Sequence, residues 1–325
     1  MIILENIKVS VILPVYKTEP YLRQCLDSII QQTLREIEII CINDSSPDNS
    51  LSILEEYAAK DHRIKVITQP NGGAGSARNN GMRHARGKYL SILDSDDFFE
   101  PTMLEEAYTK AENLSADFVI YRSDQYFTET NEFKPIRWSL RIKQLPPYEP
   151  FSHRQFTMNV FRVFQGWAWD KLYLRSFIEE HKLQFQEQRT SNDMYFGFSA
   201  TALAKKIGVI DKILVHYRID AADSLSKTRE KSWQCFYQAL CGIRTKLIQD
   251  GIFPEFEKDF INYSLHFSFW NLDTLAEPTQ TILKNKLVQE WFDDLGIKGK
   301  PASYFQEPEE YERYSKMMED NGQTP

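Results

Sequence analysis

The chain has 325 residues, of which 42% are hydrophobic, and a formal net charge of -7 at pH 7. This length allows one large hydrophobic core or two modest ones. An acidic chain lacks the broad basic surface of proteins that bind nucleic acid, so we expect no nucleic-acid partner. The four cysteines show no metal-ligand spacing and are too few for a disulfide framework, which favours a reducing compartment.

The first residues lead directly into a strand pattern, without the basic and apolar regions of a signal peptide. No apolar run approaches the roughly 20 residues that a membrane-spanning helix needs. The sequence therefore predicts a soluble, cytoplasmic protein.

Strands and helices alternate along the first 70 residues. Apolar runs predict strands over 9–16, 38–42 and 64–67, and helical periodicity predicts helices over 21–32 and about 50–60. Such alternation is typical of a doubly wound, mostly parallel sheet with helices on both faces. In these sheets the ligand binds beyond the carboxyl ends of the strands.

Polar residues follow each of these strands. Tyr16 and Glu19 follow the first strand, Asp44 follows the second, and Gln69 and Asn71 follow the third. These residues exceed what a simple turn requires, so we expect a ligand site at this edge of the sheet.

A glycine-rich segment, 71–81, follows the third strand. Its glycines permit close backbone approach, and we expect Ser76 to cap a helix that runs to about Ala85 with its N-terminus facing an anion. Arg78 adds a charge that could reach a phosphate or a carboxylate. The segment matches neither the dinucleotide-binding nor the P-loop pattern, which excludes both of those nucleotide sites.

The fourth apolar run, 89–93, ends in the cluster Asp94, Ser95, Asp96 and Asp97. Three carboxylates within four residues repel one another unless they are solvated or share a cation. Taken alone, a solvated turn is the commoner explanation. Because three other strands also end in polar residues, we favour a site for Mg²⁺ or Mn²⁺, which take carboxylate and phosphate oxygens as ligands.

The next part of the chain is less regular. We expect a helix over 103–113, a strand over 116–121, an irregular excursion over 123–150, and a helix over 156–164. Trp167 and Trp169 follow, and the sequence leaves a sugar-stacking surface and core packing equally open for them.

Two titratable residues stand out after this point. Asp193 precedes an apolar helix that ends near Leu203, where a lone Asp is usually an N-cap. His216 lies near the end of a strand predicted over 207–217. Three roles are open for it: a metal ligand, a phosphate donor or a packed histidine. Without further context the packed histidine is favoured. From 231 onward three aromatic-rich helices are expected, over 231–250, 255–271 and 279–295, followed by a short surface helix over 309–318.

Four segments at the ends of the first four predicted strands, taken in their order along the chain, resemble the motifs of the family 2 glycosyltransferases. These are enzymes of the GT-A fold that transfer a sugar from a nucleotide diphosphate donor. They span residues 8–125 without a gap, and weaker similarities follow at 169–173, 192–193 and 217–226. The four segments are 11–16 (VILPVY, with Glu19), 42–48 (INDSSPD), 69–79 (QPNGGAGSARN) and 93–97 (LDSDD).

The resemblance implies a nucleotide-sugar donor, by default a UDP-sugar. It places Asp44 against the base, Glu19 near the ribose, Asp97 in a supporting position, and Asp96 as the direct ligand of Mn²⁺ or Mg²⁺, with His216 as a further candidate ligand. The donor-binding residues that it implies are Pro14, Tyr16, Glu19, Asp44, Asn71, Gly72, Arg78, Asp94, Ser95, Arg218 and Ser224.

The family inverts the anomeric centre in a single displacement, which needs one base facing the acceptor hydroxyl. Asp193 matches that base. Asn192 stands where the family often has a second acid, so a role that requires a second carboxylate is in doubt. Trp167, Trp169 and Asn192 are expected on the acceptor side, and the expected acceptor is a glycan or a lipid-linked glycan.

These expectations divide the chain into a glycosyltransferase domain over 1–227 and a helical extension over 228–325. Within the first, 8–125 is the donor half and 126–227 the acceptor half. The extension could contact the inner face of a membrane or form a homodimer.

Two rival functions were weighed against glycosyl transfer. A sugar nucleotidyltransferase would carry a glycine-rich basic loop after the first strand, and this sequence has none there. A catalytically inactive carbohydrate-binding or scaffold protein of the same fold stays open because of Asn192.

Overall fold

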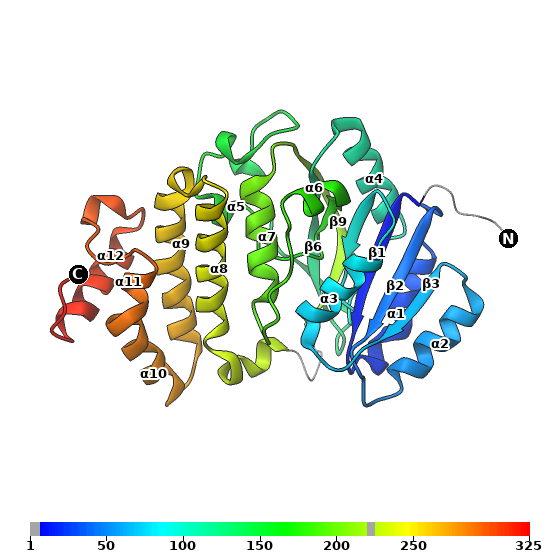
Figure 1. Cartoon of the computed structure of the whole chain (residues 1–325), viewed down its shortest axis with the longest axis horizontal. Helices are drawn as coiled ribbons and strands as arrows, with labels where there is room; N and C mark the ends of the chain where they lie inside the picture. Colours follow the sequence, from blue (N-terminus) through cyan, green and yellow to red (C-terminus); the bar gives the residue numbers. More distant parts are fainter. Residues whose placement is uncertain (1–6, 220–224) are drawn as a thin grey trace.

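The computed structural model describes residues 7–219 and 225–325. A single mixed sheet with its covering helices occupies one end of the molecule, and a group of helices occupies the other, with the chain running from the first to the second (Figure 1).

The first four strands are parallel and lie in the order β3-β2-β1-β4. They are β1 (Val9–Val15), β2 (Ile37–Asn43), β3 (Ile64–Thr68) and β4 (Tyr89–Ile92). Every residue of β1 and β2 is buried. Burial on both faces explains why these strands read as continuous apolar runs rather than alternating patterns.

Four helices cover the two faces of this half of the sheet: α1 (Glu19–Ile30), α2 (Ser50–Lys60), α3 (Gly73–His84) and α4 (Met103–Leu114). Helices α1, α2 and α4 share one apolar core with the odd-numbered residues of β1, whereas Ala77 of α3 packs on the opposite face. Helices on both faces confirm the predicted doubly wound arrangement. However, α3 begins at Gly73, three residues before the predicted start at Ser76.

The second half of the sheet is mixed. Strand β8 (Lys171–Leu174) pairs antiparallel with β4 and with β6 (Phe118–Phe127), and β9 (Ile207–Arg218) pairs parallel with β6. Strand β5 (Phe98–Phe99) lies antiparallel to β9. Because β8 reverses direction between β4 and β6, the carboxyl ends of β4 and β9 point toward the same edge.

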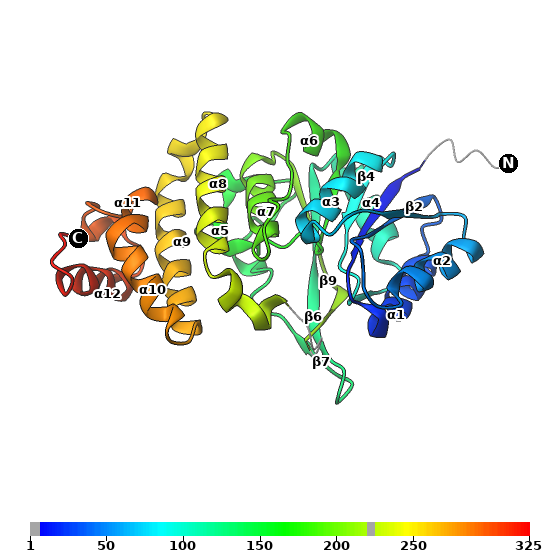
Figure 2. The same cartoon turned by 60° about the horizontal axis from the view of Figure 1, so that its bottom comes forward.

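Three strands fall where the sequence predicted none. They are the two-residue β5, β8, and β7 (Glu132–Pro135), which forms a hairpin with β6 inside the segment expected to be irregular. The hairpin projects beyond the rest of the sheet (Figure 2). The predicted helix over 156–164 shrinks to α5 (Val160–Val163), and α6 (Arg175–Glu180) follows β8.

Helix α7 (Asn192–Leu203) lies between the sheet and the helical end of the molecule (Figure 1). The predicted helices beyond it are confirmed as α8 (Cys235–Gln249), α9 (Phe253–Thr274) and α10 (Thr279–Lys286), the last continuing through a π-helical turn into α11 (Phe292–Asp294).

The last helix, α12 (Pro308–Glu319), confirms the helix predicted over 309–318, and most of its residues are exposed or only partly buried. It buries Tyr314, Met317 and Met318 in the same apolar core as α8 to α11. That core also contains Phe161 of α5 and Phe198 of α7, so packing is continuous from the sheet side into the helices. Among the described residues, none of the helices has the length and apolar character needed to cross a bilayer.

Candidate active site

The carboxylate cluster lies directly after β4 and is held by the end of β9. The backbone N–H of Arg218 donates to Asp97 Oδ1 at 2.8 Å, and Arg218 Nε donates to the carbonyl oxygen of Asp96 at 2.8 Å. The cluster is therefore fixed by a strand that lies more than 100 residues later in the sequence.

The electrostatics of this cluster favour a cation. Burial raises the pKa of Asp96 to about 6, and the charge of Asp94 adds to the effect. Burial likewise raises the pKa of Asp97 well above its ordinary range, and its Oδ2 atom is buried without a hydrogen-bond partner. A nearby divalent cation would favour the ionised forms of these groups, so the donor set fits such an ion.

The described residues contain no group of three or more His, Cys, Asp or Glu side chains arranged to hold a metal. A site of one or two carboxylates that shares its ion with phosphate oxygens and water does not need such a group. The lack of such a group therefore does not argue against a divalent cation at the cluster.

Arg78 joins the cluster to the start of α7. Its Nη2 donates to Asp94 Oδ1 at 2.5 Å, and its Nη1 donates to Asn192 Oδ1 at 2.6 Å. The guanidinium is buried and lies 5.2 Å from the ring centroid of Phe185. Arg78 thus connects the cluster after β4 to the start of α7, and its predicted contact with a diphosphate stays a prediction.

Asn192 is buried, with its amide oxygen committed to Arg78. An amide at this position satisfies the arginine without placing another negative charge beside Asp94. Asn192 therefore has a structural role at this junction, whether or not it also contacts an acceptor.

Asp193 lies in the first turn of α7 rather than at its N-cap, which is Ser191 in a left-handed conformation with φ of 54°. The usual N-cap role is therefore wrong for this aspartate. Burial raises the pKa of Asp193, an effect that the positive charge of Arg78 opposes. In the described part of the chain no side chain donates a hydrogen bond to its carboxylate, which leaves that group available to a substrate.

Asp44 fixes the N-terminus of α3. Its Oδ1 accepts from Gln69 Nε2 at 2.8 Å and from the Gly72 N–H at 2.9 Å, and its Oδ2 accepts from the Gly73 N–H at 2.8 Å. Asn71 Nδ2 donates to the Asp44 carbonyl at 2.9 Å. The anion that faces this helix N-terminus is therefore Asp44 itself, which corrects the expectation of an open anion site there.

Residues at the end of β1 lie beside this loop. Pro14 is buried, Tyr16 is 46% exposed, and the N–H of Asp44 donates to the carbonyl of Val15 at 2.9 Å. Glu19 accepts from Asn49 through both carboxylate oxygens, at 2.8 and 3.0 Å. It borders a cavity of about 470 Å³ between α1 and α2 that has no other predicted site residue in its lining.

The predicted residues on β9 have partners already. Arg218 donates from Nη1 to Thr128 at 2.7 Å and from Nη2 to Gln24 at 2.6 Å. The ring nitrogens of His216 lie 2.7 Å from Asp124 and 3.1 Å from Glu100. This arrangement favours the packed histidine among the three alternatives. Ser224 and part of the late motif at 217–226 lie outside the described residues.

The two predicted tryptophans differ in their surroundings. Trp169 is 4% exposed and packs in the main core, whereas Trp167 is only partly buried. The sequence missed Trp138, which is 50% exposed and lies 5.4 Å from Trp167 between ring centroids. It also missed the buried ion pair of Asp170 with Lys171, at 2.6 Å. No local pattern marks either feature.

The model of the family described as glycosyl transferase family 2 matches residues 10–182, which include Asp44, Arg78 and the cluster after β4. The chain belongs to this family. Membership overturns the sugar nucleotidyltransferase alternative.

A relative described as the putative glycosyltransferase EpsH of Bacillus subtilis is 36% identical over 234 residues, 71% of this glycosyltransferase chain and 66% of EpsH. The chain spans between about one third and two thirds of the length of the first curated relatives that it matches.

Solved structures share the fold. S. aureus TarS 1-349 in complex with UDP superposes with a TM-score of 0.72 at 20% identity, over 96% of this chain and 88% of that one. The mannosyltransferase PcManGT from Pyrobaculum calidifontis, in complex with GDP-Man and Mn²⁺, gives 0.54 at 14% identity, over 92% and 85%. At these identities the likeness concerns the fold alone, and it confirms the GT-A architecture with a helical segment after it.

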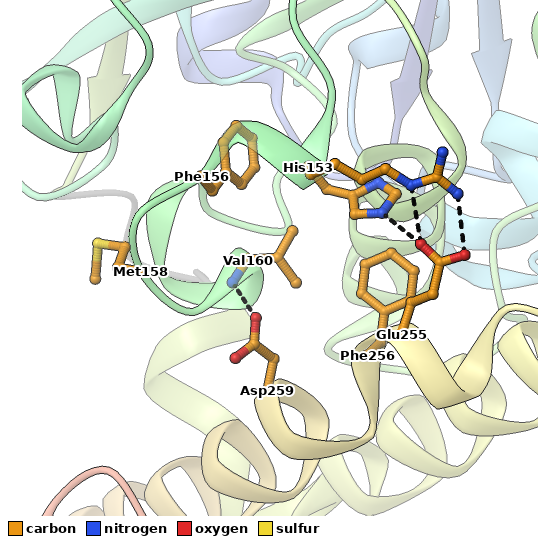
Figure 3. A pocket seen from close by; sticks show the side chains of 8 residues that line it. His153, Phe156, Met158, Val160, Glu255, Phe256 and Asp259 are labelled. Atoms are coloured by element: carbon orange, nitrogen blue, oxygen red, sulfur yellow. Dashed lines mark hydrogen bonds and ion pairs between the residues drawn. The ribbon is translucent and has the colours of Figure 1, made fainter.

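A second cavity of this glycosyltransferase, of about 260 Å³, lies where the turn at 153–158 meets α9 (Figure 3). Arg154 makes two hydrogen bonds of 3.0 Å to Glu255, and Asp259 accepts from the Val160 N–H at 3.0 Å. Arg154 and Glu255 pair with each other, Asp259 accepts from a backbone N–H and from Gln306, and the cavity contains none of the predicted site residues. We assign this cavity to packing between the two parts of the molecule.

Proposed function

We propose that this chain transfers a sugar from a nucleotide diphosphate donor, by preference a UDP-sugar, to a hydroxyl group of a glycan acceptor, with inversion and with the help of Mn²⁺ or Mg²⁺. One observation carries the proposal: the guanidinium of Arg78 binds Asp94 and Asn192 together, which brings the Asp cluster and the proposed base Asp193 to one site. The UDP bound to TarS and the GDP-Man and Mn²⁺ bound to PcManGT support the donor class.

Asp193 is the proposed base. As the acceptor oxygen attacks the anomeric carbon, the carboxylate takes the hydroxyl proton, and the bond from that carbon to the diphosphate oxygen breaks. Because burial raises the pKa of Asp193, it is a stronger base than a solvated aspartate. The backbone N–H of Asp193 itself donates to this carboxylate, and in the described part of the chain no side chain does, so no side-chain partner competes for that proton.

Asp96 and Asp94 are the proposed metal-side residues. A divalent cation bound at this point supplies positive charge to the departing diphosphate. Arg78 holds the Asp94 carboxylate in place, and Arg218 holds the backbone of Asp96 and the side chain of Asp97. The ligands are therefore positioned before any substrate arrives, which lowers the cost of reorganisation.

The ends of β1 and β2 are the proposed nucleoside site. Three donors fix the Asp44 carboxylate, and its remaining lone pairs can accept from a base. Pro14 and Tyr16 would border the base, and Glu19 would lie near the ribose. We place the enzyme in the assembly of a surface polysaccharide or a related glycan.

An inactive scaffold of the same fold is the second candidate, which Asn192 had kept open. The argument for this candidate was that Asn192 replaces an acid. That argument is weaker now, because the amide oxygen of Asn192 accepts a hydrogen bond from Arg78, so no second acid is needed there. The proposed base Asp193 is present.

A screen of nucleotide sugars with and without Mn²⁺ tests the proposal. We expect UDP-sugars with Mn²⁺ to raise the melting temperature more than either component alone, since a ligand that binds only the folded state stabilises it. We also expect slow, metal-dependent release of UDP from the same donors. Stabilisation without release or transfer, across donors and acceptors, would support the scaffold, and no stabilisation by any nucleotide sugar would refute both.

A further inference from the structure

We propose that Trp138 and Trp167 form an acceptor subsite that binds one sugar ring by stacking, and that Lys171 is the positioning residue of this subsite. The inference rests on the proposed function, because it assigns the acceptor side of the same active site.

Four aromatic rings form a continuous row, with the buried Trp169 inside it and Trp138 at its exposed end. Tyr217 stacks on Trp169 with ring centroids 5.6 Å apart, Trp169 stacks on Trp167 at 4.5 Å, and Trp138 meets Trp167 edge-on at 5.4 Å. From Trp169 outward the exposure increases, from 4% at Trp169 through the partly buried Trp167 to 50% at Trp138, whereas Tyr217 on the other side of Trp169 is partly buried. The inner rings serve packing, and the outer pair presents indole surface to solvent.

The row borders both parts of the proposed active site. At the end opposite Trp138, Tyr217 directly precedes Arg218, whose Nε binds the carbonyl of Asp96. Next to Trp167, Gly166 lies so close to α7 that an added Cβ would come within 3.1 Å of Met194 Cα, and Met194 directly follows Asp193. Burial raises the pKa of Asp193 and the charge of Lys171 opposes that rise, so the loop that carries Trp167 lies near the proposed base. The proposal places the ring of an acceptor whose hydroxyl faces Asp193 beside Trp167.

A buried lysine fixes the backbone that carries Trp167. Lys171 has no exposed surface, and its Nζ donates to the carbonyls of Trp167 at 2.8 Å and Gln165 at 3.0 Å and to the carboxylate of Asp170 at 2.6 Å. Burying a charge is costly unless it is fully hydrogen-bonded. Because this buried charge hydrogen-bonds the backbone of one loop, we infer that the position of that loop is important for the subsite.

Contact with α7 holds the same loop from the other side. A Cβ on Gly197 of α7 would lie 2.3 Å from the carbonyl oxygen of Gly166, so the helix and the loop touch with no room for a side chain. A rigid indole loses little conformational entropy when a ligand binds. Trp also combines a large apolar face with a polar N–H, which suits a sugar ring that has apolar C–H faces and polar edges.

The test measures saccharide binding to the full chain with UDP and Mn²⁺ present. The probes are the methyl glycosides of glucose, galactose and N-acetylglucosamine, each at millimolar concentration. Their binding is measured by saturation-transfer NMR. We expect Trp138→Ala to weaken binding of the preferred glycoside about threefold to tenfold, the range typical of an aromatic stacking contact, and Trp138→Phe to weaken it less. Tyr148→Ala is the matched control, because Tyr148 is an exposed aromatic residue of the same excursion.

Lys171→Met tests the positioning role, with Lys171→Arg as the conservative variant. We expect Lys171→Met to raise the acceptor KM more than it lowers kcat, and Lys171→Arg to restore part of the loss. If Lys171→Met fails to fold, Trp138→Ala still decides the proposal, because a half-exposed side chain contributes little to folding.

Two outcomes overturn the inference while sparing the proposed function: UDP binds, but no glycoside does, or glycoside affinity is the same in the wild type and in Trp138→Ala. Loss of UDP binding from the wild type would refute the proposed function instead.

Discussion

The sheet edge and the C-terminal helices differ in what they bury. All the buried charged residues and the buried histidine of the described chain lie between Glu38 and Arg218, including Arg78, Asp97 and Lys171. In the described part of 235–319 the buried polar side chains are neutral, such as Asn262 and Ser264, among a dense apolar core.

This difference separates function from stability. Buried charges cost free energy unless they are paired, and proteins concentrate them where chemistry needs them. The helices bury apolar surface instead, which favours folding in proportion to its area. We therefore expect substitutions at the sheet edge to change activity and substitutions in the helical core to change stability.

The largest expected effect on activity is that of Asp193→Asn. Removing a general base typically costs about 10²- to 10⁴-fold in rate, and the amide preserves the shape of the side chain. We expect kcat to fall within that range while UDP affinity stays close to that of the wild type. Asp273→Asn is the control. Asp273 lies in α9 and forms an exposed ion pair with Arg313 of α12, so its substitution should leave kcat unchanged. A high kcat in Asp193→Asn would remove this aspartate from catalysis.

The next effect is that of Asp96→Asn. Losing one group that stabilises charge in the transition state typically costs about 10²- to 10³-fold. We expect a loss of this size together with loss of the dependence of the rate on Mn²⁺ concentration, measured by titrating the metal at saturating donor. Asp61→Asn serves as the control, because that carboxylate pairs with Arg63 away from the site. An unchanged metal titration in Asp96→Asn would show that this residue is not a ligand.

A smaller effect concerns the pH dependence of transfer. The base works when it is deprotonated, and burial raises the pKa of Asp193 above its ordinary value of 3.8, so the rate should fall as pH is lowered through that raised pKa. The charge of Arg78 opposes the shift. We expect Arg78→Met to move the acidic limb of the pH–kcat profile to higher pH. A limb that stays in place, or moves to lower pH, would contradict the link between Arg78 and the base.

The smallest expected effect on activity is that of Leu283→Ala in α10. Leu283 is fully buried in the helical core, and truncation of such a leucine typically costs about 2–5 kcal/mol of stability. We expect a lower urea midpoint and an unchanged kcat per folded molecule at low temperature. A matched fall in kcat would show that the helices shape the active site, and the contrast between the two regions would then fail.

The sequence predicted the parallel half of the sheet well. Strand ends can be found from apolar runs and the polar residues that follow them, which is why the sequence places Asp44 and the cluster Asp94–Asp97 at one edge of the sheet. The boundaries of α3 were less accurate, because the start of that helix depends on Asp44, a capping group nearly 30 residues earlier in the chain.

The mixed half of the sheet and the segments after it were harder to predict. Strand β8 is four residues long and lies between neighbours that only the assembled sheet supplies. The side chains that α12 buries were not predicted for the same reason, since burial depends on which partner is present. Short elements and isolated tryptophans carry too little local signal to reveal such contacts.

The sequence by itself determined the family, the parallel half of the sheet and the carboxylates at its edge, because these follow from local periodicity and contiguous motifs. Only the tertiary structure decided that Arg78 meets Asn192, 114 residues away, and that Trp138 meets Trp167. Such pairs arise from the packing of distant segments. The physical reason is that local propensity sets where an element begins and ends, whereas its partners are chosen by the free energy of the whole fold.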